Sequence, residues 1–145
     1  PSTTACDGQQ WIAYASTDTP AHIVLATSQA TYVLSDTTAN APSIACFKGQ
    51  VFVSFVSAND ANRILVDFGP LPTGNCTLST PCHLTQYALT NASGTNDTTP
   101  QPPALAADGT NLFLAFVDPT NTINAGMTTD GTTSSSWSFQ SFAGK

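Results

Sequence analysis

Four aromatic and five polar side chains of this sequence have the chemistry that binding of a sugar needs. An aromatic ring stacks on the apolar face of a sugar, and acidic, amide and basic groups hydrogen-bond to its hydroxyls. The aromatic candidates are Trp11, Tyr32, Tyr87 and Trp137, and the polar candidates are Asp60, Asn62, Arg63, Asn121 and Asp130. For each residue alone, the alternative is a structural role, either as a core aromatic or as a turn-forming Asp or Asn.

The remaining reactive side chains do not form a catalytic pattern. All nine acidic residues are Asp, and only Asp67 falls within a predicted strand, whereas hydrolysis of a glycoside usually needs two positioned carboxyl groups. Neither His22 nor His83 lies beside a nucleophile motif, and the four cysteines lack the CxxC spacing of zinc ligands. We therefore expect no enzymatic activity, no metal site and no cofactor.

Low charge excludes several classes of partner. Only 8% of the residues are charged, the net charge is −6, and Lys and Arg together number 3. So few bases cannot neutralise a run of phosphates, which argues against nucleic acid and against anionic membrane surfaces. No apolar stretch approaches the roughly 18 residues of a membrane-spanning helix, so we expect no membrane insertion.

The cysteines indicate an oxidising compartment. Four cysteines allow three pairings, and the short loop between Cys76 and Cys82 favours a local bridge there. Cys6 and Cys46 would then pair, since they occupy equivalent points of two repeats. The alternative for that second pair is two buried free thiols.

Three Asn-X-Ser/Thr sequons, at Asn75, Asn91 and Asn96, fall in loop-like segments where a glycan would be accessible. Together with the cysteines, they predict a secreted, glycosylated protein outside the cell.

A repeated pattern predicts the elements that position these residues. Three times, a proline and a short apolar run lead to a Gly-containing turn and then to a strand centred on an aromatic: Trp11–Ala15, Val51–Val56 and Leu112–Val117. Each repeat divides into four short candidate strands, and no window carries a helical stripe. The sequence therefore predicts an all-β chain, organised as one β-repeat domain over residues 1–145 with units at 1–40, 41–101 and 102–145.

The third repeat gives the pattern a family resemblance. Pro103–Ala106, Leu112–Phe116 and the Asp130-Gly131 turn before Trp137 resemble the repeat of sialidase-like β-propellers and the blades of propeller lectins. This resemblance implies three four-stranded antiparallel propeller-type blades, with candidate pockets at the loops that carry the polar residues above. It does not extend to the sialidase reaction, because sialidases bind their acidic sugar through an arginine cluster and Arg63 stands alone. The alternative fold is a β-sandwich.

Three blades are fewer than the four to eight that close a propeller, so two blade faces would be left bare. We expect other copies of the chain to cover them, either as a head-to-tail filament or as a closed ring. The favoured hypothesis is a non-enzymatic structural protein that self-assembles into an extracellular filament or coat. The alternative is a carbohydrate-binding lectin that forms a closed six-bladed propeller as a dimer.

Overall fold

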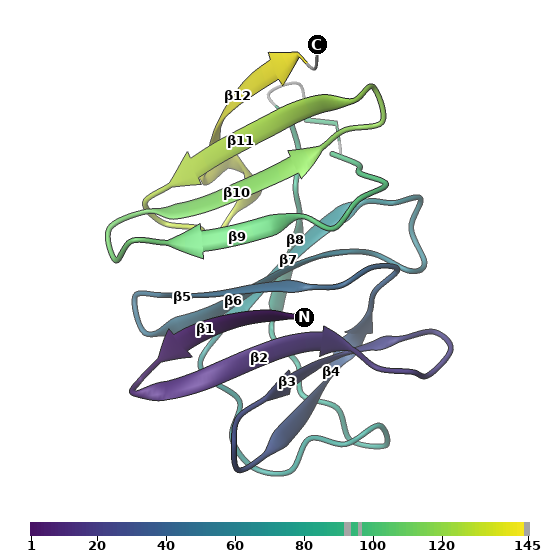
Figure 1. Cartoon of the computed structure of the whole chain (residues 1–145), viewed down its shortest axis with the longest axis vertical. Helices are drawn as coiled ribbons and strands as arrows, with labels where there is room; N and C mark the ends of the chain where they lie inside the picture. Colours follow the sequence, from purple (N-terminus) through teal and green to yellow (C-terminus); the bar gives the residue numbers. More distant parts are fainter. Residues whose placement is uncertain (92–93, 96, 144–145) are drawn as a thin grey trace.

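The chain folds into three four-stranded antiparallel sheets, each called a blade here (Figure 1). The computed structural model describes residues 1–91, 94–95 and 97–143. Blade 1 holds β1 (Ser2–Cys6), β2 (Gln9–Ala15), β3 (His22–Ala26) and β4 (Thr31–Thr37). Blade 2 holds β5 (Ser43–Phe47), β6 (Gln50–Val56), β7 (Ile64–Gly69) and β8 (Thr85–Ala88). Blade 3 holds β9 (Ala104–Ala107), β10 (Leu112–Val117), β11 (Thr122–Thr128) and β12 (Ser138–Ala143), with the short 3₁₀ turn η1 (Ser134–Ser136) before β12.

The predicted all-β class and its three propeller-type blades are confirmed, and the chain does not form the two packed sheets of a β-sandwich. Blade 2 lies between blades 1 and 3 along the long axis of the molecule, and the sheets do not close into a ring (Figure 1). The first strands of the blades lie side by side, β1 against β5 and β5 against β9. No helix among the described residues is long and apolar enough to cross a membrane.

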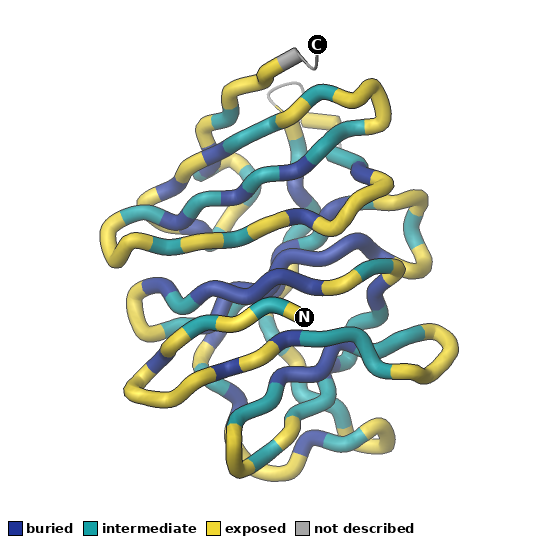
Figure 2. Tube along the Cα trace, in the orientation of Figure 1, coloured by how far each residue is buried: buried dark blue, intermediate teal, exposed yellow. Residues whose placement is uncertain are grey.

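Two apolar layers hold the blades together. One lies between blades 1 and 2 and includes Trp11, Leu25 and Phe55, while the other lies between blades 2 and 3 and includes Phe52 and Leu112. Because blade 2 is covered on both faces, β6 is buried from Val51 to Val56, and Figure 2 shows this central strand in dark blue. In β10 of blade 3, by contrast, buried and half-buried residues alternate.

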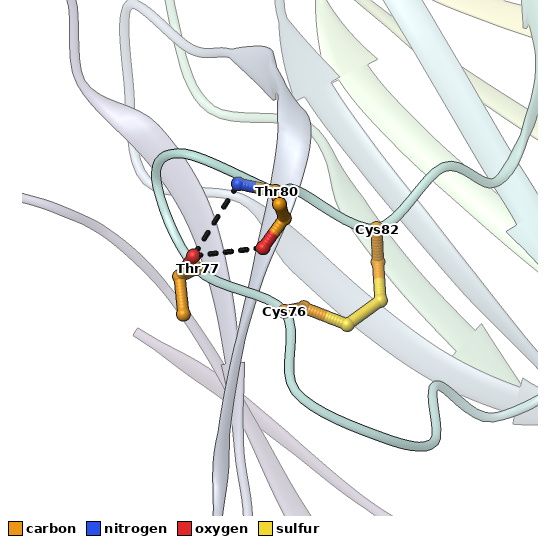
Figure 3. The surroundings of a disulfide bond; sticks show 4 residues. All are labelled: Cys76, Thr77, Thr80 and Cys82. Atoms are coloured by element: carbon orange, nitrogen blue, oxygen red, sulfur yellow. Dashed lines mark hydrogen bonds between the residues drawn. A yellow bond between two sulfur atoms is a disulfide. The ribbon is translucent and has the colours of Figure 1, made fainter.

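Tight turns and disulfides fix the strands. Asp7-Gly8 and Lys48-Gly49 have positive φ angles at both residues, as a two-residue hairpin turn between right-twisted strands requires. Both predicted disulfides are present. Cys6–Cys46 joins blade 1 to blade 2, and Cys76–Cys82 closes the long β7–β8 connection (Figure 3).

The disulfide-closed loop also covers an edge of blade 1. Within it, Thr77 Oγ1 accepts a hydrogen bond from the Thr80 backbone N–H at 3.3 Å (Figure 3). The backbone N–H of Val33 in β4 donates to the carbonyl of Cys76 at 3.1 Å, and the N–H of Cys82 donates back to Val33 at 2.8 Å. The outer strand of blade 1 is therefore paired with a segment of blade 2, which satisfies backbone groups that an open edge would leave free.

Candidate functional site

Two hollows lie at the boundaries between neighbouring blades. The first, called the Trp137 pocket here, has a volume of about 660 Å³ and lies between blades 2 and 3. It is lined by Thr90, Asn91, Gly94, Asp97, Phe116, Asn124, Ser135, Trp137, Phe139 and Ser141. The second, called the Arg63 pocket, has a volume of about 530 Å³ and lies between blades 1 and 2. It is lined by Ser35, Asp36, Thr37, Ser57, Asn59, Asp60, Arg63, Leu65, Gln86, Tyr87 and Ala88.

The two pockets occupy equivalent places in successive blades. Leu65 of β7 pairs with Phe55 of β6, and Asn124 of β11 pairs with Phe116 of β10. The pocket-lining residue at this position is thus apolar in blade 2 and an amide in blade 3. Although the position is the same, the two hollows present different chemistry to a ligand.

An aromatic wall forms one side of the Trp137 pocket. The rings of Trp137 and Phe139 are stacked, with their centroids 5.8 Å apart, and Phe116 meets Phe139 edge to face at 5.9 Å. Phe139 lies across from Gly126 in the sheet, and a Cβ at Gly126 would come within 2.3 Å of the Phe139 ring. The glycine therefore makes room for the ring that covers it.

Trp137 is fixed by hydrogen bonds to the neighbouring blade. Its Nε1–H donates to the Tyr87 hydroxyl at 2.8 Å, and that hydroxyl donates to the carbonyl of Gly131 at 2.8 Å. Burial raises the pKa of Tyr87 to about 12, so the phenol keeps its proton for this bond. Since the indole N–H is already satisfied, Trp137 has only its ring surface to offer a ligand.

Polar groups lie beside the aromatic wall in the same pocket, because Asn124 is directly opposite both Phe116 and Ser141 in the sheet. Ser141 Oγ donates to Asn124 Oδ1 at 2.6 Å, and Asn124 Nδ2 donates to Asp118 Oδ2 at 3.3 Å, which orients the amide. Burial, and then the nearby Asp118 carboxylate, raise the pKa of Asp97. The Asp97 side chain accepts no hydrogen bond from the residues that the structure describes, so its oxygens are open to a ligand donor. A smaller hollow of about 390 Å³ continues from here toward the β10–β11 turn.

Ionic and amide groups dominate the Arg63 pocket. Arg63 and Asp60 form an ion pair at 2.8 Å across the β6–β7 turn, and both side chains are partly exposed. Asn59 Nδ2 donates to Thr37 Oγ1 at 3.1 Å, which links this turn to the end of β4. Pairing of Asp60 with Arg63 leaves the pocket without a strong net charge from these two groups.

A buried carboxyl group lies beside the Arg63 pocket. The Gln86 Nε2 group donates to Asp67 Oδ1 at 2.8 Å and to Asp36 Oδ1 at 2.9 Å, so one amide links the two blades. Burial, and then the Asp36 carboxylate, raise the pKa of Asp67 to about 8. Asp67 is fully buried and lines neither pocket, so it cannot exchange a proton with a bound ligand.

The structure brings some of the predicted site residues together and separates others. Asp60, Arg63 and Tyr87 line the Arg63 pocket, and Trp137 lines the other one. Trp11 is only 3% exposed and stacks on Tyr32 in the layer between blades 1 and 2.

The other three predicted polar residues lie in turns. Asn62 and Asn121 have φ angles of 62° and 66°, a region that asparagine tolerates better than most side chains. Asp130 accepts a hydrogen bond from Thr132 Oγ1 at 2.6 Å, while the N–H groups of Asp130 and Gly131 are held by Thr128 Oγ1. The turn that resembles an Asp-box is therefore tied by a threonine rather than by its own aspartate.

Several pocket residues were not predicted from the sequence, namely Phe116, Phe139, Asn124, Asp97, Asp36 and Gln86. One signal pointed to Phe139, because a glycine interrupts the neighbouring strand at Gly126 and glycine in a strand often marks close approach of another group. Asn75 and Asn91, two of the predicted glycan acceptors, are exposed, while Asn96 lies outside the described residues. Among the described residues, no three His, Cys, Asp or Glu side chains gather as metal ligands.

No protein-family model matches the sequence, and no curated protein matches it. Among solved structures, a fucose lectin from Kordia zhangzhouensis, determined in complex with methyl-fucoside, is similar in fold. The TM-score is 0.59, the sequence identity is 9%, and the match covers 99% of this chain and 99% of that chain. The likeness is consistent with a propeller-lectin fold over the length of the chain, whereas a sialidase-like repeat is not supported by it.

Proposed function

We propose that this protein binds carbohydrate in the Trp137 pocket. The observation that carries the proposal is the pairing of an aromatic wall, made by Trp137 and Phe139, with an amide and a carboxylate, Asn124 and Asp97. A sugar has one apolar face and a set of hydroxyls, and this pocket offers a surface for each. The fucose lectin with a similar fold supports the same class of ligand.

The chemistry of the pocket favours a neutral sugar. Its charged groups are the carboxylates of Asp97 and Asp118, and no Lys or Arg among the described residues lines it. An acidic sugar would meet repulsion there, whereas hydroxyl groups can donate to the carboxylate oxygens. Methyl-fucoside is therefore a suitable first ligand, since it is neutral and has a methyl group for the aromatic wall. The proposed role is binding without catalysis.

A glycan array followed by calorimetric titration of the best ligand tests the proposal. Asn124→Leu replaces the amide by the side chain that blade 2 carries at the same position, and we expect at least about a fivefold loss of affinity, since a buried polar contact is worth about 1–3 kcal/mol. Asn59→Ala, in the Arg63 pocket, is the matched control and should leave affinity unchanged. Silence across a broad array, or equal binding by Asn124→Leu, would contradict the proposal.

A second candidate function is self-assembly outside the cell. The chains would associate through their blade faces, either as a ring of two chains or as a filament or coat. The observation that favours self-association is that large apolar side chains on blades 1 and 3 are exposed, among them Ile12, Ile123 and Phe142 at 41%, 48% and 52%. The two disulfides, and the exposed sequon residues Asn75 and Asn91, support a secreted and glycosylated chain. Mass measurement of the purified protein in solution tests for association, and fibres or rings under negative stain separate the two forms.

A further inference from the structure

Blade 1 packs on blade 2 in the same way that blade 2 packs on blade 3. The backbone N–H of Ile44 donates to Ser2 Oγ at 3.2 Å, and the backbone N–H of Leu105 donates to Ser43 Oγ at 2.9 Å. Ser2 and Ser43 hold the same position, since each begins the first strand of its blade. We call the face that meets the next blade in the chain the leading face, and the face that meets the preceding blade the trailing face.

One position on the leading face is apolar in all three blades but covered in only two. Ile23, Ile64 and Ile123 are equivalent, because they pair with Ala15, Val56 and Val117 at the ends of β2, β6 and β10. Ile23 and Ile64 are 0% exposed, whereas Ile123 is 48% exposed. The third copy of a residue that the fold buries twice is therefore left open.

The trailing face shows the complementary pattern. Ile12, Val53 and Leu114 are equivalent, because they pair with Thr3, Ile44 and Leu105 of the first strands. Val53 and Leu114 are 0% and 1% exposed, whereas Ile12 is 41% exposed. Blade 1 thus has an open trailing face and blade 3 an open leading face, and these two blades lie at opposite ends of the long axis (Figure 1).

Among the described residues, the strands of the open leading face of blade 3 are mainly apolar and carry no charged side chain, while Asp108 lies in the turn just beyond β9. Its strand residues, which share the side of Ile123 by alternation and register, are Ala104, Ala106, Phe113, Ala115, Val117, Ile123, Ala125, Met127, Ser138, Gln140 and Phe142. Met127 is 44% exposed and Phe142 is 52% exposed. A shallow apolar hollow of about 200 Å³ lies here between Ala104, Phe113 and Ala125. An apolar surface of this kind marks a site of association.

We propose that the leading face of blade 3 docks on the trailing face of blade 1 of a second copy, head to tail, and repeats the contact made twice within the chain. This inference rests on the proposed self-association and adds to it the two surfaces and their register. It is independent of sugar binding.

A second copy fits this surface better than an unrelated partner. Within the chain, each covered leading face packs on the trailing face of the next blade. The open leading face of blade 3 therefore fits a trailing face, and blade 1 of a second copy has one that is uncovered. The trailing face of blade 1 is equally neutral, with Thr3, Ala5, Gln10, Ile12, Tyr14, Val24, Ala26, Thr31 and Val33 on the side of Ile12. A contact that joins the leading face of one copy to the trailing face of the next is heterologous, because the two surfaces differ. Such a contact either closes a ring or extends a filament.

The native disulfide supplies a geometric test of the register. Cys6 and Cys46 join the leading side of blade 1 to the trailing side of blade 2, with their Cα atoms 5.4 Å apart. Cys6 lies four residues after Ser2. Ala104 is the blade 3 equivalent of Ser2, and Asp108 lies four residues after it, so Asp108 is the equivalent of Cys6. Cys46 is opposite Val51 in blade 2, and its equivalent in blade 1 is Ala5, opposite Gln10. The proposed contact therefore places Asp108 of one copy beside Ala5 of the next.

The experiment mixes two variants that each add one cysteine to the four native ones, Asp108→Cys and Ala5→Cys, under oxidised glutathione. We expect a covalent dimer from the mixture, seen on a non-reducing gel and by intact mass, and little from either variant alone. Thr120→Cys mixed with Ala5→Cys is the matched control, since Thr120 lies in an exposed turn away from the face. Efficient cross-linking of Ala5→Cys with itself would show a symmetric contact and overturn the proposal.

Sedimentation velocity of the unmodified chain and of two charge variants, at micromolar concentrations, completes the test. Ile123→Asp spoils the leading face and Ile12→Asp spoils the trailing face, so neither variant should associate alone. Their mixture retains one intact face of each kind and should form a dimer. Association of the unmodified chain without the Ala5–Asp108 cross-link would overturn the docking register while self-association stands. A chain that stays monomeric across the micromolar range would overturn both.

Discussion

Asp67 and Asp36 belong to different blades and share one hydrogen-bond donor, the Nε2 group of Gln86, at 2.8 and 2.9 Å. Two ionised carboxylates held this way repel each other, and Asp67 is fully buried. The second oxygen of Asp67 accepts no hydrogen bond from the described residues, and when Asp67 is protonated its hydroxyl can donate to Asp36.

Stability is predicted to fall as the pH rises from about 4 to about 8. Burial and the Asp36 charge raise the pKa of Asp67 from 3.8 to about 8, so the folded chain binds a proton that the unfolded chain releases near pH 4. The stabilisation is complete below the unfolded pKa and is lost as the pH passes through the folded pKa. Melting temperatures from pH 4 to pH 9 measure this trend.

Asp67→Asn is the variant that isolates this group, since an amide can accept from Gln86 and donate to Asp36 at every pH. We expect it to remove most of the downward trend in stability and to be more stable than the unmodified chain at pH 9. Parallel pH curves for the two proteins would contradict the assignment.

Gly126→Ala is predicted to damage both stability and ligand binding. A Cβ at this position would lie 2.3 Å from the Phe139 ring, so the ring must move out of the aromatic wall. Overpacking of this kind costs about 1–3 kcal/mol. Urea unfolding measures the loss, and sugar titration shows whether the displaced ring also weakens binding. Ala125→Gly, on the opposite face of the same strand, is a control that should leave the pocket intact.

The two disulfides are predicted to contribute unequally to the free energy of unfolding. Cys6–Cys46 spans a sequence separation of 40 and Cys76–Cys82 spans 6. In the chain-entropy model, closing the longer loop stabilises by about 4 kcal/mol and the shorter by about 2 kcal/mol. Replacing each pair by alanine and measuring denaturant unfolding tests the ranking. A larger loss from the Cys76–Cys82 pair would show that its pairing with β4 matters more than loop length.

Two serine substitutions on the open leading face are predicted to change the affinity of self-association in opposite directions. Ser2 and Ser43, which are equivalent to Ala104, each accept a hydrogen bond from a backbone N–H of the next blade. The hydroxyl of Ala104→Ser should accept a hydrogen bond from the Thr3 N–H of the second copy in the same way, and so strengthen association. One such bond is worth about 1 kcal/mol, or about fivefold in Kd. Ala115→Ser should weaken association, because the equivalent Ser54 Oγ is buried without a partner among the described residues. Sedimentation velocity measures both, and equal effects would contradict the register.

Period-two alternation and turn residues predict the fold of this chain well. The repeat of an aromatic strand after a Gly turn places β2, β6 and β10 correctly. The predicted Cys6–Cys46 bridge is also present, although the strand register makes Cys46 equivalent to Ala5, one residue before Cys6. These signals are local, or they recur at a fixed period, so a single sequence carries them.

The pockets could not be predicted in the same way, because their walls come from different blades. Trp137 reaches Tyr87 across 50 residues of sequence, and Gln86 reaches Asp36 across the same span. Trp11 has the chemistry of a sugar platform, yet it lies in the layer between two blades because its strand faces blade 2. Residue type alone does not distinguish a ring in a pocket wall from a ring in the core.

The indole N–H signals of the two tryptophans test the central proposal most directly. Trp137 is 9% exposed and lines the pocket, whereas Trp11 is 3% exposed in the layer between blades 1 and 2 and lines neither pocket, so the protein contains its own control. On titration with methyl-fucoside or the best glycan from an array, the ¹⁵N–¹H signal of Trp137 should move in a saturable way while that of Trp11 stays in place. A ligand that binds without moving the Trp137 signal would contradict the account.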